Sequence, residues 1–110
     1  MENKKAFLSR LAAGVFEYRN ADGWRLKFGV DNECIPDIRV IYLSTRALKN
    51  EPWYYLKEML LHEAAHIGEM RPGSWQTHDE GFFLRLGELC IRFSSYEPNT
   101  SLSLPCGRRG

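Results

Sequence analysis

His62-Glu63-Ala64-Ala65-His66 is the stretch around which this sequence is organised. Side chains four residues apart lie on one face of an α-helix, about one turn from each other along the axis. Two imidazoles in this arrangement can bind one metal ion at about 2.0–2.1 Å from nitrogen to metal. Glu63 lies about 100° further round the helix, too far to be a ligand but near enough to take a proton from a water activated by the metal. The stretch therefore predicts a helix that carries a metal site.

A third ligand is expected, because catalytic zinc uses three protein ligands and keeps one position open. The chain has three histidines, and the one outside the stretch is His78. We predict that His62, His66 and His78 bind Zn²⁺. Asp79 and Glu80 remain alternatives to His78, because some sites of this kind use a carboxylate as the third ligand.

Composition indicates one folded domain. The 110 residues are 44% hydrophobic and 13% aromatic, which is enough for a single core. The net charge of +1, from 15 basic and 14 acidic residues, gives no strong attraction to nucleic acid. No apolar run approaches the length of a membrane span, and the first residues lack the apolar core of a signal peptide.

Cysteine usage points to reduced thiols. Cys34, Cys90 and Cys106 are widely spaced and include no C-x-x-C pair, so the sequence supports neither a disulfide framework nor a cysteine zinc ribbon. We expect a cytoplasmic protein with three free thiols.

Hydrophobic spacing in the first half predicts a helix over residues 3–18 and a turn at 20–23. Two strands should follow, over residues 24–30 and 38–43, paired antiparallel across the loop between them. A third short strand is expected at 33–35. The buried face of the first strand should carry Trp24, Leu26, Phe28 and Val30.

The second half predicts two longer helices. After a connector over residues 44–49, the helix of the histidines should begin at residue 50 or 51, with Pro52 in its first turn, and stop by Gly68. Its expected core stripe is Trp53, Leu56, Leu60, Ala64 and Ile67. Beyond a turn at 70–76, the pair Thr77 and Glu80 forms a capping box that would place His78 in the first turn of a new helix. The core side of that helix should carry Phe82, Leu86, Leu89 and Phe93. These elements predict an α+β domain over residues 1–97 and a mobile tail over 98–110.

The segment 60–86 resembles the SprT-like (Spartan-type) zinc metallopeptidases of the zincin class. In that family a helix bearing H-E-x-x-H is followed by a third histidine and then an aromatic, as in His78-Asp79-Glu80-Gly81-Phe82-Phe83. The resemblance implies an N-terminal helix, a small antiparallel sheet, an active-site helix and a C-terminal helix. It also implies His62, His66 and His78 as zinc ligands, with Glu63 as general base. The sequence has no cysteine zinc ribbon, so it matches a minimal catalytic core of the family.

The expected function is a zinc endopeptidase with a protein or peptide substrate. The substrate would lie extended along a sheet edge, for which we select residues 39–44. Tyr55, Tyr96 and Arg85 are candidates for stabilising the oxyanion. One alternative is a catalytically silent zinc-bearing protein-binding module, which has no need of Glu63. Another is a DNA-associated repair protease, which the balanced charge disfavours. No membrane partner is expected, and the oligomeric state is not predicted.

Overall fold

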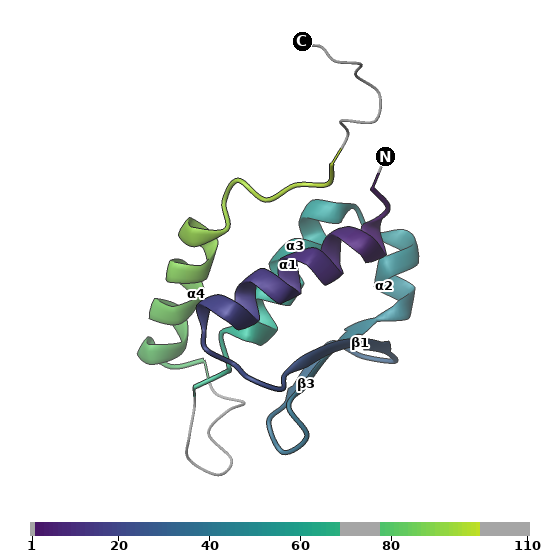
Figure 1. The fold of residues 1–110 in the computed structure, drawn as a ribbon. Helices are drawn as coiled ribbons and strands as arrows, with labels where there is room; N and C mark the ends of the chain where they lie inside the picture. Colours follow the sequence, from purple (N-terminus) through teal and green to yellow (C-terminus); the bar gives the residue numbers. More distant parts are fainter. Residues whose placement is uncertain (1, 69–77, 100–110) are drawn as a thin grey trace.

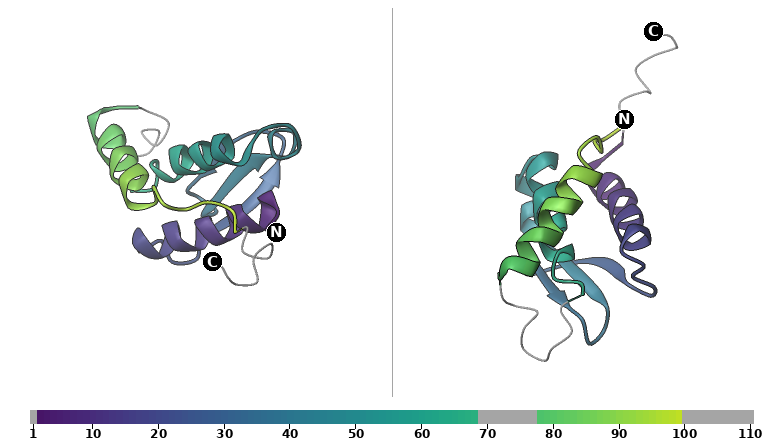
Figure 2. Two further views of the ribbon diagram at one scale, coloured as in Figure 1. Left: turned by 90° about the horizontal axis from the view of Figure 1, so that it is seen from above. Right: turned by 90° about the vertical axis from the view of Figure 1, so that its left-hand side faces the viewer.

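The computed structural model describes residues 2–68 and 78–99, which form helices and a small mixed sheet. In chain order the elements are α1 (Lys4–Tyr18), β1 (Arg25–Gly29), β2 (Glu33–Ile35), β3 (Val40–Ser44), α2 (Thr45–Asn50), α3 (Trp53–Ala64) and α4 (Glu80–Arg92). Helices α1 and α3 pack side by side over one face of the sheet, and α4 packs against α3 (Figures 1 and 2). Within the described ranges, no helix has the length and apolar character to cross a membrane.

The predicted N-terminal helix is confirmed as α1. Asn3 caps it by accepting a hydrogen bond from the backbone N–H of Ala6 at 2.7 Å, which satisfies one of the free donors at a helix start. Its apolar stripe is buried, with Phe7, Leu8, Leu11, Ala12 and Val15 in the core. The turn that follows needs two residues of positive φ, and Asn20 (φ 53°) and Gly23 (φ 80°) supply them.

The predicted antiparallel pairing of the two longer strands is wrong. β1 pairs with β3 in parallel, and the short strand β2 pairs antiparallel with β3, so the strand order is β1-β3-β2. The chain reverses once before β2 and once after it, where Arg39 takes a positive φ of 54°. Two reversals restore the original direction, which makes β1 and β3 parallel.

This order also corrects the predicted substrate edge. Residues 39–44 contain β3, which is the central strand, so both of its sides are already hydrogen-bonded to neighbours. Ile41 and Leu43 on β3 are fully buried beneath the helices. Val30 was expected on the buried face of the first strand, but it is 88% exposed because β1 ends at Gly29 and the chain turns there.

The connector after β3 is a short helix, α2, capped by the side chain of Ser44. Helix α3 begins at Trp53, later than predicted, and Pro52 is its N-cap residue rather than part of the first turn. The expected core stripe is largely confirmed, because Leu56, Leu60, Ala64 and Ile67 are buried and Trp53 packs against the core. Leu61 and Ala65 are also buried.

Helix α4 begins differently from the prediction. Asp79 is the N-cap, and its side chain accepts a hydrogen bond from the N–H of Phe82 at 2.9 Å. His78 therefore precedes the helix instead of lying in its first turn, and Thr77 lies outside the described residues, as do the predicted turn at 70–76 and most of the predicted tail. The predicted core side of this helix is confirmed, because Phe82, Leu89 and Phe93 are buried and Leu86 packs against the core. Cys34 is buried and Cys90 exposed, and neither forms a disulfide among the described residues, whereas Cys106 is outside the described part.

The segment after α4 runs back along α1 to its start. Arg10 donates two hydrogen bonds to the carboxylate of Glu2, at 2.9 and 3.1 Å, and one to the carbonyl of Glu97 at 2.8 Å. The backbones of Glu2 and Asn99 are also joined, and the N–H of Asn99 donates to the Glu2 carboxylate at 2.9 Å. These contacts lower the pKa of Glu2 from its ordinary value of 4.5 to about 2, chiefly through the hydrogen bond from Arg10.

A pH-dependent contribution of Glu2 to stability follows. A carboxylate whose pKa is lowered by folding stabilises the native state above its unfolded pKa, and this contribution is lost as pH falls from about 4.5 to about 2. We expect Glu2→Gln to lower the Tm at pH 7, with the difference from the native chain closing near pH 2. Thermal unfolding followed by circular dichroism at both pH values measures this. Glu97→Gln is the control, because Glu97 takes part through its backbone; an equal loss in that variant would contradict the assignment.

Candidate metal centre

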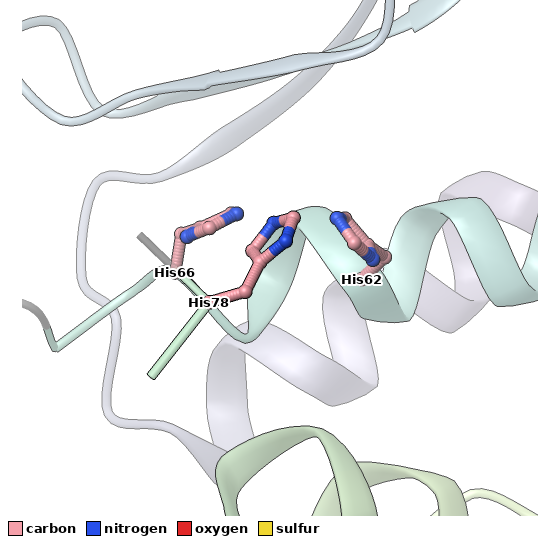
Figure 3. Close-up of side chains that lie close together, drawn as sticks. All are labelled: His62, His66 and His78. Atoms are coloured by element: carbon pink, nitrogen blue, oxygen red, sulfur yellow. The ribbon is translucent and has the colours of Figure 1, made fainter. Parts of the chain in front are cut away.

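Three histidines from separate points of the fold meet at one end of α3. His62 lies in the last turn of α3, His66 lies in the turn just beyond it, and His78 immediately precedes the cap of α4. Figure 3 shows the three imidazole rings gathered together on the same side of the helix end. One nitrogen from each ring can be chosen so that all three lie within 4.8 Å of one another.

His66 lies where the helix tightens as it ends. The N–H of Ala65 still bonds to the carbonyl of Leu61 four residues back, at 2.9 Å. The next two N–H groups, those of His66 and Ile67, bond three residues back at 3.1 and 3.0 Å, as in a 3₁₀ turn. Gly68 then takes a positive φ of 107°, and the prediction that the helix stops by this residue is confirmed.

The separation of the rings fits a shared ion. Nitrogens held at about 2.0–2.1 Å around a tetrahedral metal lie about 3.4 Å apart. The three imidazole nitrogens lie within 4.8 Å of one another, so small side-chain movements would bring them to this spacing. Among the described residues, the cluster of metal-binding types here consists of the three histidines alone. Asp79 is occupied as the cap of α4, which disfavours it as a ligand in place of His78. The three predicted ligands thus lie close enough to bind a metal ion.

The surroundings of His62 suit metal binding. His66 is 5% exposed, His62 is half-buried and His78 is exposed. Burial lowers the pKa of His62, and the neighbouring His78 and His66 lower it further because an added charge would be repelled. The neutral imidazole is the form that binds a metal, so these surroundings favour the binding-competent state of His62.

Glu63, which directly follows His62 in α3, is a buried residue. Its residue is 8% exposed, and burial raises its pKa from 4.5 to about 7, with a smaller contribution from the charge of Glu33 on β2. A cation bound nearby would oppose this shift by stabilising the carboxylate. The side chain is therefore kept largely out of bulk water.

Phe82 supports all three rings, a role that sequence reasoning did not assign to it. Its ring centroid lies 4.5 Å from that of His78, 4.6 Å from that of His66 and 5.1 Å from that of His62. The side chain is fully buried. Helical spacing correctly marked Phe82 as core, but spacing alone does not show that the histidines pack on it.

Shortening Phe82 should loosen the centre. We expect Phe82→Leu to cost about 1–2 kcal/mol of stability and to weaken metal affinity about tenfold, because the rings lose a rigid support. Metal affinity by chelator competition and thermal unfolding test the two effects separately. Phe93→Leu is the matched control, since Phe93 is also a buried phenylalanine, at the C-cap position of α4, but packs against Tyr18 and Tyr96. Equal affinity loss in both variants would contradict a local role.

The three candidates for stabilising an oxyanion lie in different places. Tyr96 packs on Phe93 and beneath Arg10 of α1, in the segment that returns to the chain start. Tyr55 is on α3, about two turns before His62. Arg85 donates from its Nε to the carbonyl of Ala65 at 2.7 Å, beside the turn that carries His66.

Comparisons of the chain with models of protein families, with curated proteins and with solved structures give no match. The likeness to SprT-like metallopeptidases stays a prediction from the residues of the sequence.

Proposed function

We propose that this protein is a zinc-dependent peptidase. The observation that carries the proposal is the meeting of His62, His66 and His78, and the buried residue Glu63 directly follows the first of them in the chain. Three neutral nitrogen donors suit zinc, and a three-ligand set leaves a coordination position open for chemistry. When bound there, zinc would supply an acidified water and a Lewis acid for the scissile carbonyl.

Glu63 is the residue to which we assign proton transfer. It precedes Ala64 at the end of α3, next in sequence to one proposed ligand and three residues from another. From this place its carboxylate can accept the proton of the attacking water and pass it to the leaving amine. Burial keeps competing water away from the carboxyl, so the proton is delivered to the reacting groups.

An extended peptide has a free strand edge available at β2. Because β2 is the outer strand of the described sheet and pairs with β3 on one side, its other side can bond a peptide backbone. Helix α3 contacts β2, so a peptide at this edge would run beside the helix that ends at the histidines.

A hollow of about 410 Å³ lies among the start of β2, α2 and α3. Its lining includes Asn32, just before β2, Arg46 of α2 and Tyr55 of α3. Tyr55 precedes His62 by two helical turns, about 10.5 Å, which is roughly three residues of extended chain. A substrate side chain about three residues from the cleaved bond could therefore enter this hollow.

A cleavage assay with metal removal and return tests the proposed function. We expect the protein, purified without added metal, to contain about one zinc per chain and to cut an unfolded substrate such as casein. A chelator should stop cleavage, and stoichiometric zinc should restore it. Bound zinc without any cleavage, across casein and a mixed peptide library, would contradict the peptidase and leave the metal site standing. Cleavage that survives complete metal removal would contradict the proposed role of zinc.

A further inference from the structure

Two arginines from different helices hold the turn that carries His66. The Nε of Arg85, on α4, donates to the carbonyl of Ala65 at 2.7 Å. An Nη of Arg19, in the C-cap position of α1, donates to the carbonyl of Ile67 at 2.8 Å. The two carbonyls belong to the residues immediately before and after His66.

These carbonyls need partners because α3 ends just before them. The last carbonyls of a helix have no intrahelical N–H, and a buried carbonyl without a hydrogen bond is costly. Ala65 is fully buried and Ile67 is 8% exposed, so water has little access to this part of the turn. The guanidinium groups supply the missing donors and complement the negative end of the helix dipole.

The arrangement carries an electrostatic cost. The side chain of Arg19 is 17% exposed, and its Nε is buried without a hydrogen-bond partner among the described residues. Burial lowers the pKa of Arg19, and the charge of Arg85 lowers it further. Glu88 lies 3.8 Å from the other Nη of Arg19 and offsets part of this repulsion.

Gly68 makes room for Arg19. A Cβ at residue 68 would lie 2.8 Å from an Nη of Arg19, closer than real contacts allow. The positive φ of 107° at the same residue also favours glycine. The backbone at 68 is thus shaped so that the guanidinium can reach the carbonyl of Ile67.

We propose that Arg19 and Arg85 are positioning residues for the metal centre: together they fix the turn over residues 65–68 and so set the place of His66 relative to His62 and His78. The inference rests on the proposed zinc site but not on peptide cleavage. His66 lies beyond the regular part of α3, so the helix alone does not orient it. Arg19 anchors the turn to α1, and Arg85 anchors it to the helix that follows His78.

Zinc affinity, measured by competition with a chelating dye, tests the proposal alongside unfolding of the metal-free protein. We expect Arg19→Met and Arg85→Met each to weaken zinc binding about 10- to 100-fold, as loss of groups that orient a ligand does. The lysine variants at both positions should recover part of the affinity, because an ammonium group can still donate to a carbonyl. The effects of the two methionine changes should not add, because both act on one turn.

Arg39→Met is the matched control. Arg39 also donates to a backbone carbonyl in a turn, that of Asp22 at 3.2 Å, but this turn carries no histidine. We expect native zinc affinity in that variant even if its unfolding temperature falls. If a methionine variant does not fold without metal, the glutamine variant at the same position replaces it, since its amide keeps a donor without the charge.

The outcomes separate this inference from the proposed function. Native zinc affinity in the folded variants at 19 and 85 would overturn the positioning role while leaving the zinc site intact. If Arg39→Met weakens zinc binding as much as the variants at 19 and 85 do, the positioning role would be overturned too, because the effect would then be one of general stability. A native chain that binds no zinc would overturn the metal centre and this inference together.

Discussion

Glu63→Gln is expected to abolish peptide cleavage while leaving the metal and the fold in place. The amide keeps the size and polarity of the carboxyl, so its buried position at the end of α3 should tolerate the change. The amide cannot accept a proton from the attacking water, and a general base contributes about 10²–10⁴-fold to rate. The three histidines are untouched, so metal content should stay near that of the native chain.

The measurement is the cleavage rate on one substrate with metal content determined on the same samples. Glu58→Gln is the matched control, because Glu58 is an exposed glutamate of the same helix. Its rate should equal that of the native chain. Equal cleavage by the native and Glu63→Gln proteins would show that the activity belongs to a contaminant or to another mechanism. A native chain that cuts nothing, but binds a partner as well as Glu63→Gln does, would favour the silent binding module.

His66→Ala is expected to weaken metal binding more than any other single change at the centre. If three imidazoles share a binding energy of about 10 kcal/mol or more, loss of one should cost at least about a hundredfold in affinity. His66 is also the most buried of the three, so water has little access to its place. Metal content after dialysis against a weak chelator, and affinity by dye competition, measure the effect.

His78→Ala and Asp79→Ala separate the ligand from the cap. We expect His78→Ala to weaken metal binding strongly. Asp79→Ala should leave affinity nearly native and cost about 1 kcal/mol of stability, because its side chain caps α4. Full metal affinity in His78→Ala would point instead to Asp79 or Glu80 as the third ligand.

Local patterns predicted much of the framework. The apolar stripe of α1, the core face of α3 and the core face of α4 follow from a period of 3.6 residues, which any packed helix must present. The pairing of His62 with His66 on one face is likewise local. The same period does not give the helix boundaries, because the caps at Pro52 and Asp79 depend on which backbone N–H groups are left free.

The direction and order of the strands could not be read from the same patterns. Alternation marks a strand but does not say which neighbour it will pair with, and the short strand β2 took the antiparallel place beside β3. β1 pairs with the other side of β3 in parallel. β2 is therefore an outer strand of the sheet, beside α3. This strand order moves the proposed substrate edge from residues 39–44, on the central strand β3, to the outer strand β2.

The sequence by itself determined the helices, their buried faces and the i, i+4 spacing of His62 and His66, because each depends on residues within a few turns of one another. The tertiary structure alone decided that His78 meets the other two, that Phe82 lies against all three rings and that Arg19 and Arg85 hold the turn around His66. These contacts join α1, α3 and α4 across long stretches of chain. They depend on how whole helices pack, which no local period encodes.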